Sequence, residues 1–262
     1  SKVIDMVPNA WQTWNDLAES QIAIGQYDQA LTRLDRSLTI TGDSSQSIVA
    51  LNLRGTALQR LGRTDDAIVS IKRGLSLSRT QTGLNMIRDI NSDRGVSFDV
   101  ERFDRAIEED PEDVAAYYFR GLAHLARGNF ENAKQDVEKS YGLGLTLDEV
   151  RATRGYTHLK SGNPAAASGE LAVALKGSPR DAIINAYYGE FQISLGSYAL
   201  ALNLLTNASQ LDPGLGLAHL LRGEIFRTLG LEESAKEVFR ASTGLDLPTA
   251  EHYIDRGAIL AS

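Results

Sequence analysis

The sequence predicts an all-α protein built as a stack of antiparallel helix pairs. Glycines recur every 34 residues from Gly128 to Gly230. Between them, apolar residues are spaced three or four positions apart, as they are on one face of a helix. Each repeat contains two such apolar runs separated by a short polar turn. A fixed period of this kind indicates a repeat array, in which each repeat packs on its neighbours.

Two glycines and one alanine recur in each repeat. In residues 117–133 they are Gly121, Gly128 and Ala133. The first glycine and the alanine have almost no side chain, so they predict a close contact between two antiparallel helices. The second glycine predicts the turn, where a left-handed backbone is needed. The matching residues elsewhere are Gly55, Gly155, Gly189, Gly223 and Gly257, then Gly25, Gly62, Gly162, Gly196 and Gly230, and then Ala30, Ala67, Ala167, Ala201 and Ala235.

The period divides the chain into an N-terminal segment, residues 1–10, and one array over residues 11–262. We expect about seven repeats, near residues 11–44, 48–80, 80–113, 114–147, 148–181, 182–215 and 216–249. Residues 249–260 repeat the helix-opening pattern and are predicted to cap the last repeat.

The third repeat is degenerate. Ile87 and Asp99 stand where small residues are expected, and the polar stretch 91–97 predicts a short first helix. Ordinary drift is the favoured interpretation, since a repeat array tolerates one weak member. The alternative is a joint between residues 1–80 and 114–262.

The pattern resembles the tetratricopeptide repeat family over residues 11 to about 260. Trp14, Leu17 and Tyr27 match this family in the first repeat, and Pro179 and Pro213 match its closing proline. The resemblance implies a right-handed superhelical solenoid with a groove lined by the first helix of each repeat. By position, it implies as groove residues Asn15, Glu19, Asn52, Tyr118, Leu122, Leu125, Glu149, Tyr156, Leu159, Ile183, Glu190, Leu217, Leu220, Glu224 and Arg227.

Composition and motifs argue against catalysis and against metal binding. The chain has no cysteine, which excludes disulfides, thiolate metal sites and a cysteine nucleophile. His124 and His158 occupy the same position in adjacent repeats, and we interpret them as packed interface residues rather than metal ligands. No catalytic motif stands out. We therefore expect no enzyme activity, no metal site and no cofactor.

The charge pattern bears on the possible partners. The net charge is −7, and Arg227 is the single basic residue among the predicted groove residues, so we expect no binding to nucleic acid. No apolar run is long enough to cross a membrane. Arginines precede the first glycine in several repeats, as Arg120 and Arg154 do. We interpret them as structural residues that pair with acids between repeats, with an anion-binding ladder as the alternative.

The predicted groove favours a protein partner. An apolar strip from Tyr118 to Leu220, edged by Glu149, Glu190 and Glu224, suits a peptide or helical segment that carries Lys or Arg beside apolar anchors. Residues 1–10 or a second copy are the alternative occupants. The resembled family includes a Lys and Asn clamp for chaperone C-termini, and no repeat of this chain carries that pair.

The function that follows is a non-catalytic interaction scaffold or adaptor within a multiprotein assembly. One alternative is an assembly factor that acts by self-association, as in bacterial lipoprotein- or pilus-assembly proteins of this architecture. Another is a regulatory domain of a larger protein. The compartment stays unassigned: the lack of cysteine suits a cytoplasmic or an exported bacterial protein, and no leader is visible.

Overall fold

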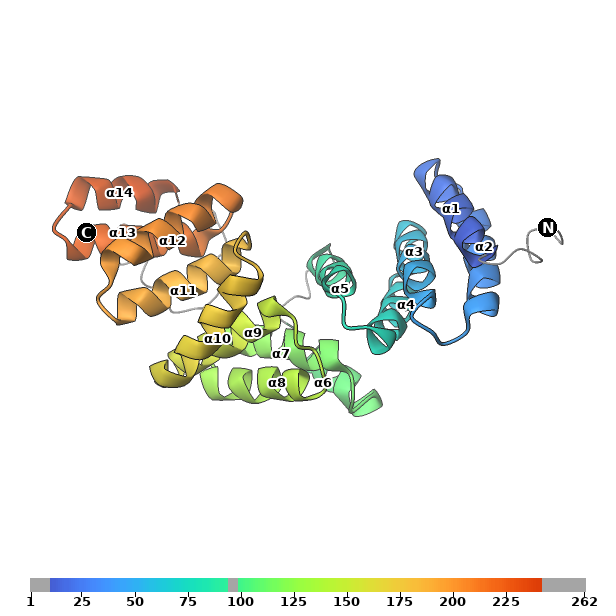
Figure 1. The fold of residues 1–262 in the computed structure, drawn as a ribbon, viewed down its shortest axis with the longest axis horizontal. Helices are drawn as coiled ribbons and strands as arrows, with labels where there is room; N and C mark the ends of the chain where they lie inside the picture. Colours follow the sequence, from blue (N-terminus) through green and yellow to red (C-terminus); the bar gives the residue numbers. More distant parts are fainter. Residues whose placement is uncertain (1–9, 94–98, 242–262) are drawn as a thin grey trace. The chain divides into compact units, whose positions relative to one another are not determined.

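A computed structural model describes residues 10–93 and 99–241, and in these residues the protein is all-α with no strand (Figure 1). Most helices form antiparallel pairs joined by short turns. The predicted cap at 249–260 and the segment 1–9 lie outside the described residues. The helices are α1 (Ala10–Ala23), α2 (Tyr27–Thr41), α3 (Ser47–Arg60), α4 (Thr64–Leu77), α5 (Gln81–Asp93), α6 (Val100–Glu109), α7 (Val114–Ala126), α8 (Phe130–Gly142), α9 (Asp148–Lys160), α10 (Pro164–Gly177), α11 (Ala182–Ser194), α12 (Tyr198–Leu211), α13 (Gly216–Thr228) and α14 (Glu232–Ala241).

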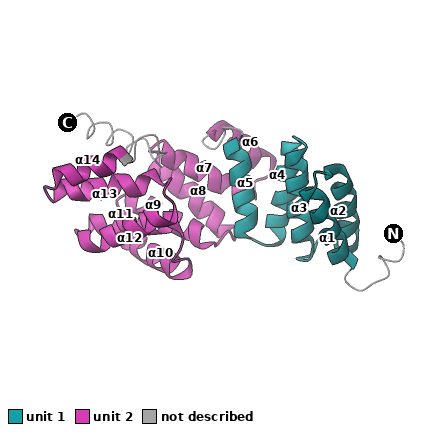
Figure 2. Ribbon diagram, turned by 90° about the horizontal axis from the view of Figure 1, so that it is seen from above, with its two compact units in different colours: residues 1–97 teal, residues 98–262 magenta. Residues whose placement is uncertain are grey.

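The chain divides into two compact units, which Figure 2 shows in different colours. Unit 1 is Ser1–Ser97 and contains α1 to α5. Unit 2 is Phe98–Ser262 and contains α6 to α14. The boundary falls inside the degenerate third repeat, between its two helices.

The close helix contacts predicted from the small residues are confirmed. A Cβ atom built on Gly121 would lie 2.8 Å from Cγ2 of Val137, and one on Gly155 would lie 2.8 Å from Cγ of Leu171. Contacts this short leave no room for a methyl group. Ala133 lies on the facing helix and is fully buried. Glycine therefore sets the distance between the two helices of a pair.

The turn role of the second glycine is also confirmed. Gly128 has a φ of +75°, in the left-handed region that favours glycine, and nothing lies within 4 Å of the position its Cβ would take. Its backbone conformation, rather than crowding, explains its presence. The two glycine positions of one repeat thus require glycine for different reasons, a close helix contact in one and a left-handed backbone in the other.

The third repeat differs from its prediction. Its first helix, α5, is 13 residues long, so the expectation of a short helix is wrong. Leu84, Ile87 and Ile90 are buried at helical spacing, while Asn85 and Asp89 are exposed. Ser92 and Asp93 of the predicted polar stretch still belong to this helix, and residues 94–98 lie outside the described residues. The shorter helix of this repeat is the second, α6, with 10 residues.

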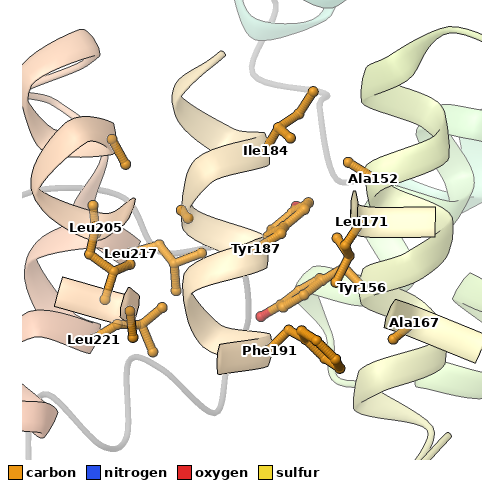
Figure 3. Close-up of a cluster of buried hydrophobic side chains, with 14 of the residues drawn as sticks. Ala152, Tyr156, Ala167, Leu171, Ile184, Tyr187, Phe191, Leu205, Leu217 and Leu221 are labelled. Atoms are coloured by element: carbon orange, nitrogen blue, oxygen red, sulfur yellow. The ribbon is translucent and has the colours of Figure 1, made fainter. Parts of the chain in front are cut away.

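The core of unit 2 runs from one repeat into the next (Figure 3). The rings of Tyr156 on α9 and Tyr187 on α11 stack with centroids 3.9 Å apart and planes 4° apart. Consecutive first helices α9, α11 and α13 contact one another, and the second helices α10 and α12 each contact their pair partner and the following first helix. The first helices therefore form an inner layer of unit 2.

Candidate functional site

We define the first-helix face of unit 2 as the surface of α7, α9, α11 and α13 on which the predicted groove residues lie. Burial separates all the predicted groove residues into three groups. Buried are Asn15, Tyr118, Leu125, Glu149, Tyr156, Leu217 and Leu220; partly buried are Asn52, Leu122, Leu159, Ile183, Glu190 and Glu224; exposed are Glu19 and Arg227.

Tyr118 is an inter-repeat contact in this structure. Its side chain on α7 is fully buried, and its hydroxyl donates to Oε1 of Glu149 at 2.7 Å. The same hydroxyl lies 3.2 Å from Oγ1 of Thr153, and that Oγ1 donates to the backbone oxygen of Glu149 at 2.9 Å. These bonds satisfy polar groups that would be costly to bury without partners. Tyr118 thereby joins the fourth repeat to the fifth.

Tyr156 makes an equivalent link one repeat further on. Its hydroxyl donates to Oε2 of Glu190 at 2.8 Å, while its ring stacks on Tyr187. Lys160 donates to the other carboxylate oxygen of Glu190 at 3.2 Å. The two tyrosine–glutamate bonds join α7 to α9 and α9 to α11. These two bonds were not predicted from the sequence, because the position of a residue in the repeat does not show which side chain it bonds.

These bonds change the interpretation of the acidic edge. The carboxylate of Glu149 points to a buried hydroxyl, and that of Glu190 accepts from Tyr156 and Lys160. The Lys160 and Glu190 side chains are 12% and 14% exposed, so much of this charge is balanced within the protein. Sequence analysis missed Lys160, although an Lys thirty residues before a groove glutamate was a possible signal.

Partly exposed apolar side chains remain on the first-helix face. They are Leu122 on α7, Leu159 on α9, and Ile183 and Ile193 on α11. Leu159, Ile183 and Ile193 also pack against the core of unit 2, which fixes their positions. Three consecutive first helices thus each offer an apolar contact, a pattern that suits an apolar segment laid across them.

The three predicted groove residues of unit 1 are all polar. Asn15 on α1 is 4% exposed, and neither its Nδ2 nor its Oδ1 has a hydrogen-bond partner among the described residues. Glu19 is exposed and Asn52 on α3 is partly buried. The apolar residues among the predicted groove residues therefore all lie in unit 2.

The arginine residues form a ladder of ion pairs, as interpreted from the sequence. Arg120 bonds Asp136 on its own pair partner and Asp104 on the preceding second helix, both at 2.6 Å. Arg154 repeats this arrangement with Glu170 at 2.9 Å and Glu138 at 3.3 Å. Hydrogen bonding to Asp136 raises the pKa of Arg120 further above its usual value. The guanidinium groups of Arg120 and Arg154 are already bonded to carboxylates of this chain, which argues against the anion-binding alternative.

The histidines lie beside this ladder. Nε2 of His124 is 3.8 Å from Oδ2 of Asp136, and burial lowers the pKa of His124 below its ordinary value of 6.5. Nε2 of His158 is 3.1 Å from Oε1 of Glu138. Within residues 10–93 and 99–241, no three His, Asp or Glu side chains gather as a metal site would require. None of the helices in these ranges is long and apolar enough to cross a membrane.

The helix pairs, their glycine contacts and the inner layer of first helices define a helical repeat protein of the class that binds other polypeptides. Two family models described as tetratricopeptide repeat match the chain, one over residues 12–80 and one over residues 100–143 and 153–215. The chain therefore belongs to the tetratricopeptide repeat family, whose members are generally protein–protein interaction modules without catalytic activity.

Solved structures are similar in fold. A tetratricopeptide repeat protein from Parabacteroides merdae aligns with a TM-score of 0.54 at 18% identity, covering 96% of this chain and 99% of its own. A chain of the APC/C hetero-tetramer Cut9–Hcn1 aligns with a TM-score of 0.55 at 14% identity, covering 93% of this chain and 47% of its own. PilF of Pseudomonas aeruginosa aligns with a TM-score of 0.51 at 14% identity, covering 95% and 96%. At these identities the likeness concerns the fold alone.

Curated relatives match over a shorter stretch. DnaJ homolog subfamily C member 3 from Rattus norvegicus and from Homo sapiens is 30% identical over 82 residues, which is 31% of this chain. The match spans 16% of the length of those proteins. Because it covers so little of either protein, this match indicates no shared role.

Proposed function

We propose that this chain is a non-catalytic scaffold that binds a segment of a partner protein on the first-helix face of unit 2, within a multiprotein assembly. The observation that supports this most directly is the set of partly exposed apolar side chains on three consecutive first helices, Leu122, Leu159 and Ile193. A helix or an extended segment could place apolar side chains on all three. Membership in the family supports the general role, and these residues are the contact that we propose.

The proposed partner segment carries apolar anchors with a Lys or Arg beside them. Glu224 and Arg227 lie on α13, which contacts α11, and Glu224 is partly buried. A basic residue of the partner would lie favourably near that carboxylate, while Arg227 would favour an acidic residue further along. Tyr118 and Tyr156 are buried, and in this proposal they do not contact the partner but fix the positions of the helices that do.

The test is selection from a displayed peptide library with the wild-type chain as bait. Apolar peptides with a basic residue are expected, and their affinity should fall at least tenfold for Leu159→Ser/Ile193→Ser. Val69→Ser is the matched control, because Val69 is an exposed apolar residue on α4 of unit 1. Circular dichroism melting of each variant separates lost binding from lost folding. Selected peptides that bind all three proteins equally would place the site elsewhere.

A further inference from the structure

One arginine of the ion-pair ladder has no carboxylate partner among the described residues. The acids that bond Arg120 and Arg154 lie sixteen residues before and sixteen residues after each arginine. Arg222 precedes the first glycine of the seventh repeat in the same way, but Thr206 and Val238 occupy those two positions. Neither of these side chains carries a charge. The ladder therefore lacks both of its acids at Arg222.

The Arg222 side chain is left with one neutral acceptor. The residue is partly buried on α13, and its Nη1 donates to Oγ of Ser209 on α12 at 3.3 Å. Arg222 makes no other hydrogen bond or ion pair within residues 10–93 and 99–241. A guanidinium group has five N–H donors, so Arg222 keeps several that no described side chain accepts. Partial burial of an unpaired charge is unfavourable, and an added anion would offset that cost.

The surroundings of Arg222 are close to neutral. Residues 191–231 contain two arginines and two acids, so their charges sum to zero. The preceding second helix, α12, has no charged residue, and α14 has three acids and two bases. Much of the net charge of −7 lies elsewhere, since residues 99–113 contain eight acidic and two basic residues. An acidic group that approaches Arg222 therefore does not face that excess of acids.

We propose that Arg222 binds a side-chain carboxylate of a partner protein, from an Asp or a Glu, in place of the acids that the ladder lacks there. Carboxylates bond the equivalent Arg120 at 2.6 Å and the equivalent Arg154 at 2.9 and 3.3 Å. The planar guanidinium group matches a carboxylate through two parallel N–H bonds. The same position in the seventh repeat is therefore suited to a carboxylate from outside the chain.

This site is separate from the first-helix face. Arg222 is not among the predicted groove residues, and it bonds Ser209 on a second helix. The proposed apolar contacts lie on the first helices α7, α9 and α11. This inference does not depend on the proposed function.

The affinity of acidic peptides for the wild-type chain and for its variants tests the proposal. Peptides that contain Asp or Glu and no Lys or Arg are selected from a displayed library, and fluorescence anisotropy measures their binding. Arg222→Met keeps an apolar stem in place and should weaken binding at least tenfold. Thr206→Glu adds a carboxylate at the position from which Glu138 bonds Arg154. It should also weaken binding at least tenfold, and it should raise the melting temperature, because Arg222 gains a partner within the chain.

Two matched controls should leave the binding unchanged. Thr206→Gln has the size of the glutamate variant without its charge, and Arg180→Met removes an exposed arginine from the segment before α11. Leu159→Ser/Ile193→Ser should leave it unchanged as well, which separates this site from the proposed function.

The proposal is overturned if the library yields no peptide that the wild type binds. Equal binding by the wild type, Arg222→Met and Thr206→Glu would overturn it too. Inorganic phosphate that displaces the peptides when present at the same concentration would show that the site prefers a phosphate group, against the assignment to a carboxylate.

Discussion

The glycines of α9 and α10 allow one substitution to be compared in two surroundings. Gly155 and Gly169 both lie inside helices of the fifth repeat, and alanine should favour both helices by about 0.5–1 kcal/mol. At Gly169 the added methyl group meets nothing within 4 Å, so Gly169→Ala is expected to stabilise the fold by that amount.

At Gly155 the same methyl group would lie 2.8 Å from Cγ of Leu171, 3.0 Å from Cβ of Glu170 and 3.2 Å from the backbone oxygen of Ala167. Leu171 is fully buried and the oxygen belongs to a helix, so neither can move without shifting α10. Overpacking of this kind costs about 1–3 kcal/mol. With the middle of each range, subtraction of the gain in helix propensity leaves Gly155→Ala destabilising the fold by about 1 kcal/mol.

Urea unfolding followed by circular dichroism measures both variants against the wild type. The experiment is done at low concentration, where any association between copies is negligible. The two midpoints should shift in opposite directions with the slope unchanged. If Gly155→Ala gains as much stability as Gly169→Ala, the close helix contact is not what requires glycine in the first helices.

Three further outcomes follow from the inter-repeat bonds. Arg120→Met should lower the free energy of unfolding by about 2–3 kcal/mol in urea titrations, because it leaves Asp136 without its main partner. The Asp136 side chain is 8% exposed, so water replaces that partner poorly. The double variant Arg120→Met/Asp136→Leu should recover part of this loss. Tyr118→Phe should cost about 1–2 kcal/mol by the same assay, since Glu149 loses a buried donor, while Val69→Ala should cost less than about 0.5 kcal/mol. His124→Gln should reduce the loss of stability between pH 7.5 and 5.5. The pKa of His124 is lowered in the folded protein, so the unfolded chain binds this proton first as the pH falls below 6.5, which favours unfolding. An equal loss of stability in the variant and the wild type would contradict this.

Periodic features of the fold were predictable from the sequence, and features that depend on one specific partner were not. Gly121 and Ala133 recur in register, so their spacing alone indicated a helix contact, and the structure confirms it. The expectation of a short helix before the polar stretch 91–97 was wrong, because α5 continues through the buried Ile90 and Asn91 to Asp93. Amphipathic spacing was the better signal there.

The candidate site was less predictable for the same reason. Position in the repeat placed Tyr118 and Leu159 alike on the groove side, yet one is fully buried and the other is partly exposed. The Tyr118 hydroxyl contacts Glu149 and Thr153, which lie in the next repeat. A contact across repeats depends on which side chains happen to face each other. The period of the sequence carries no information about that.

The tyrosine bonds also determine how the proposed binding site must be tested. Removing Tyr156 would break its stack on Tyr187 and its bond to Glu190, so lost binding could reflect displaced helices. Tyr156→Phe is the sharper change, because it keeps the stacked ring and removes only the hydroxyl bond. If α9 and α11 hold Leu159 and Ile193 in place through that bond, Tyr156→Phe should weaken peptide binding only modestly. The serine substitutions at the two apolar residues should weaken it far more, and the reverse order would move the contact to Tyr156 itself.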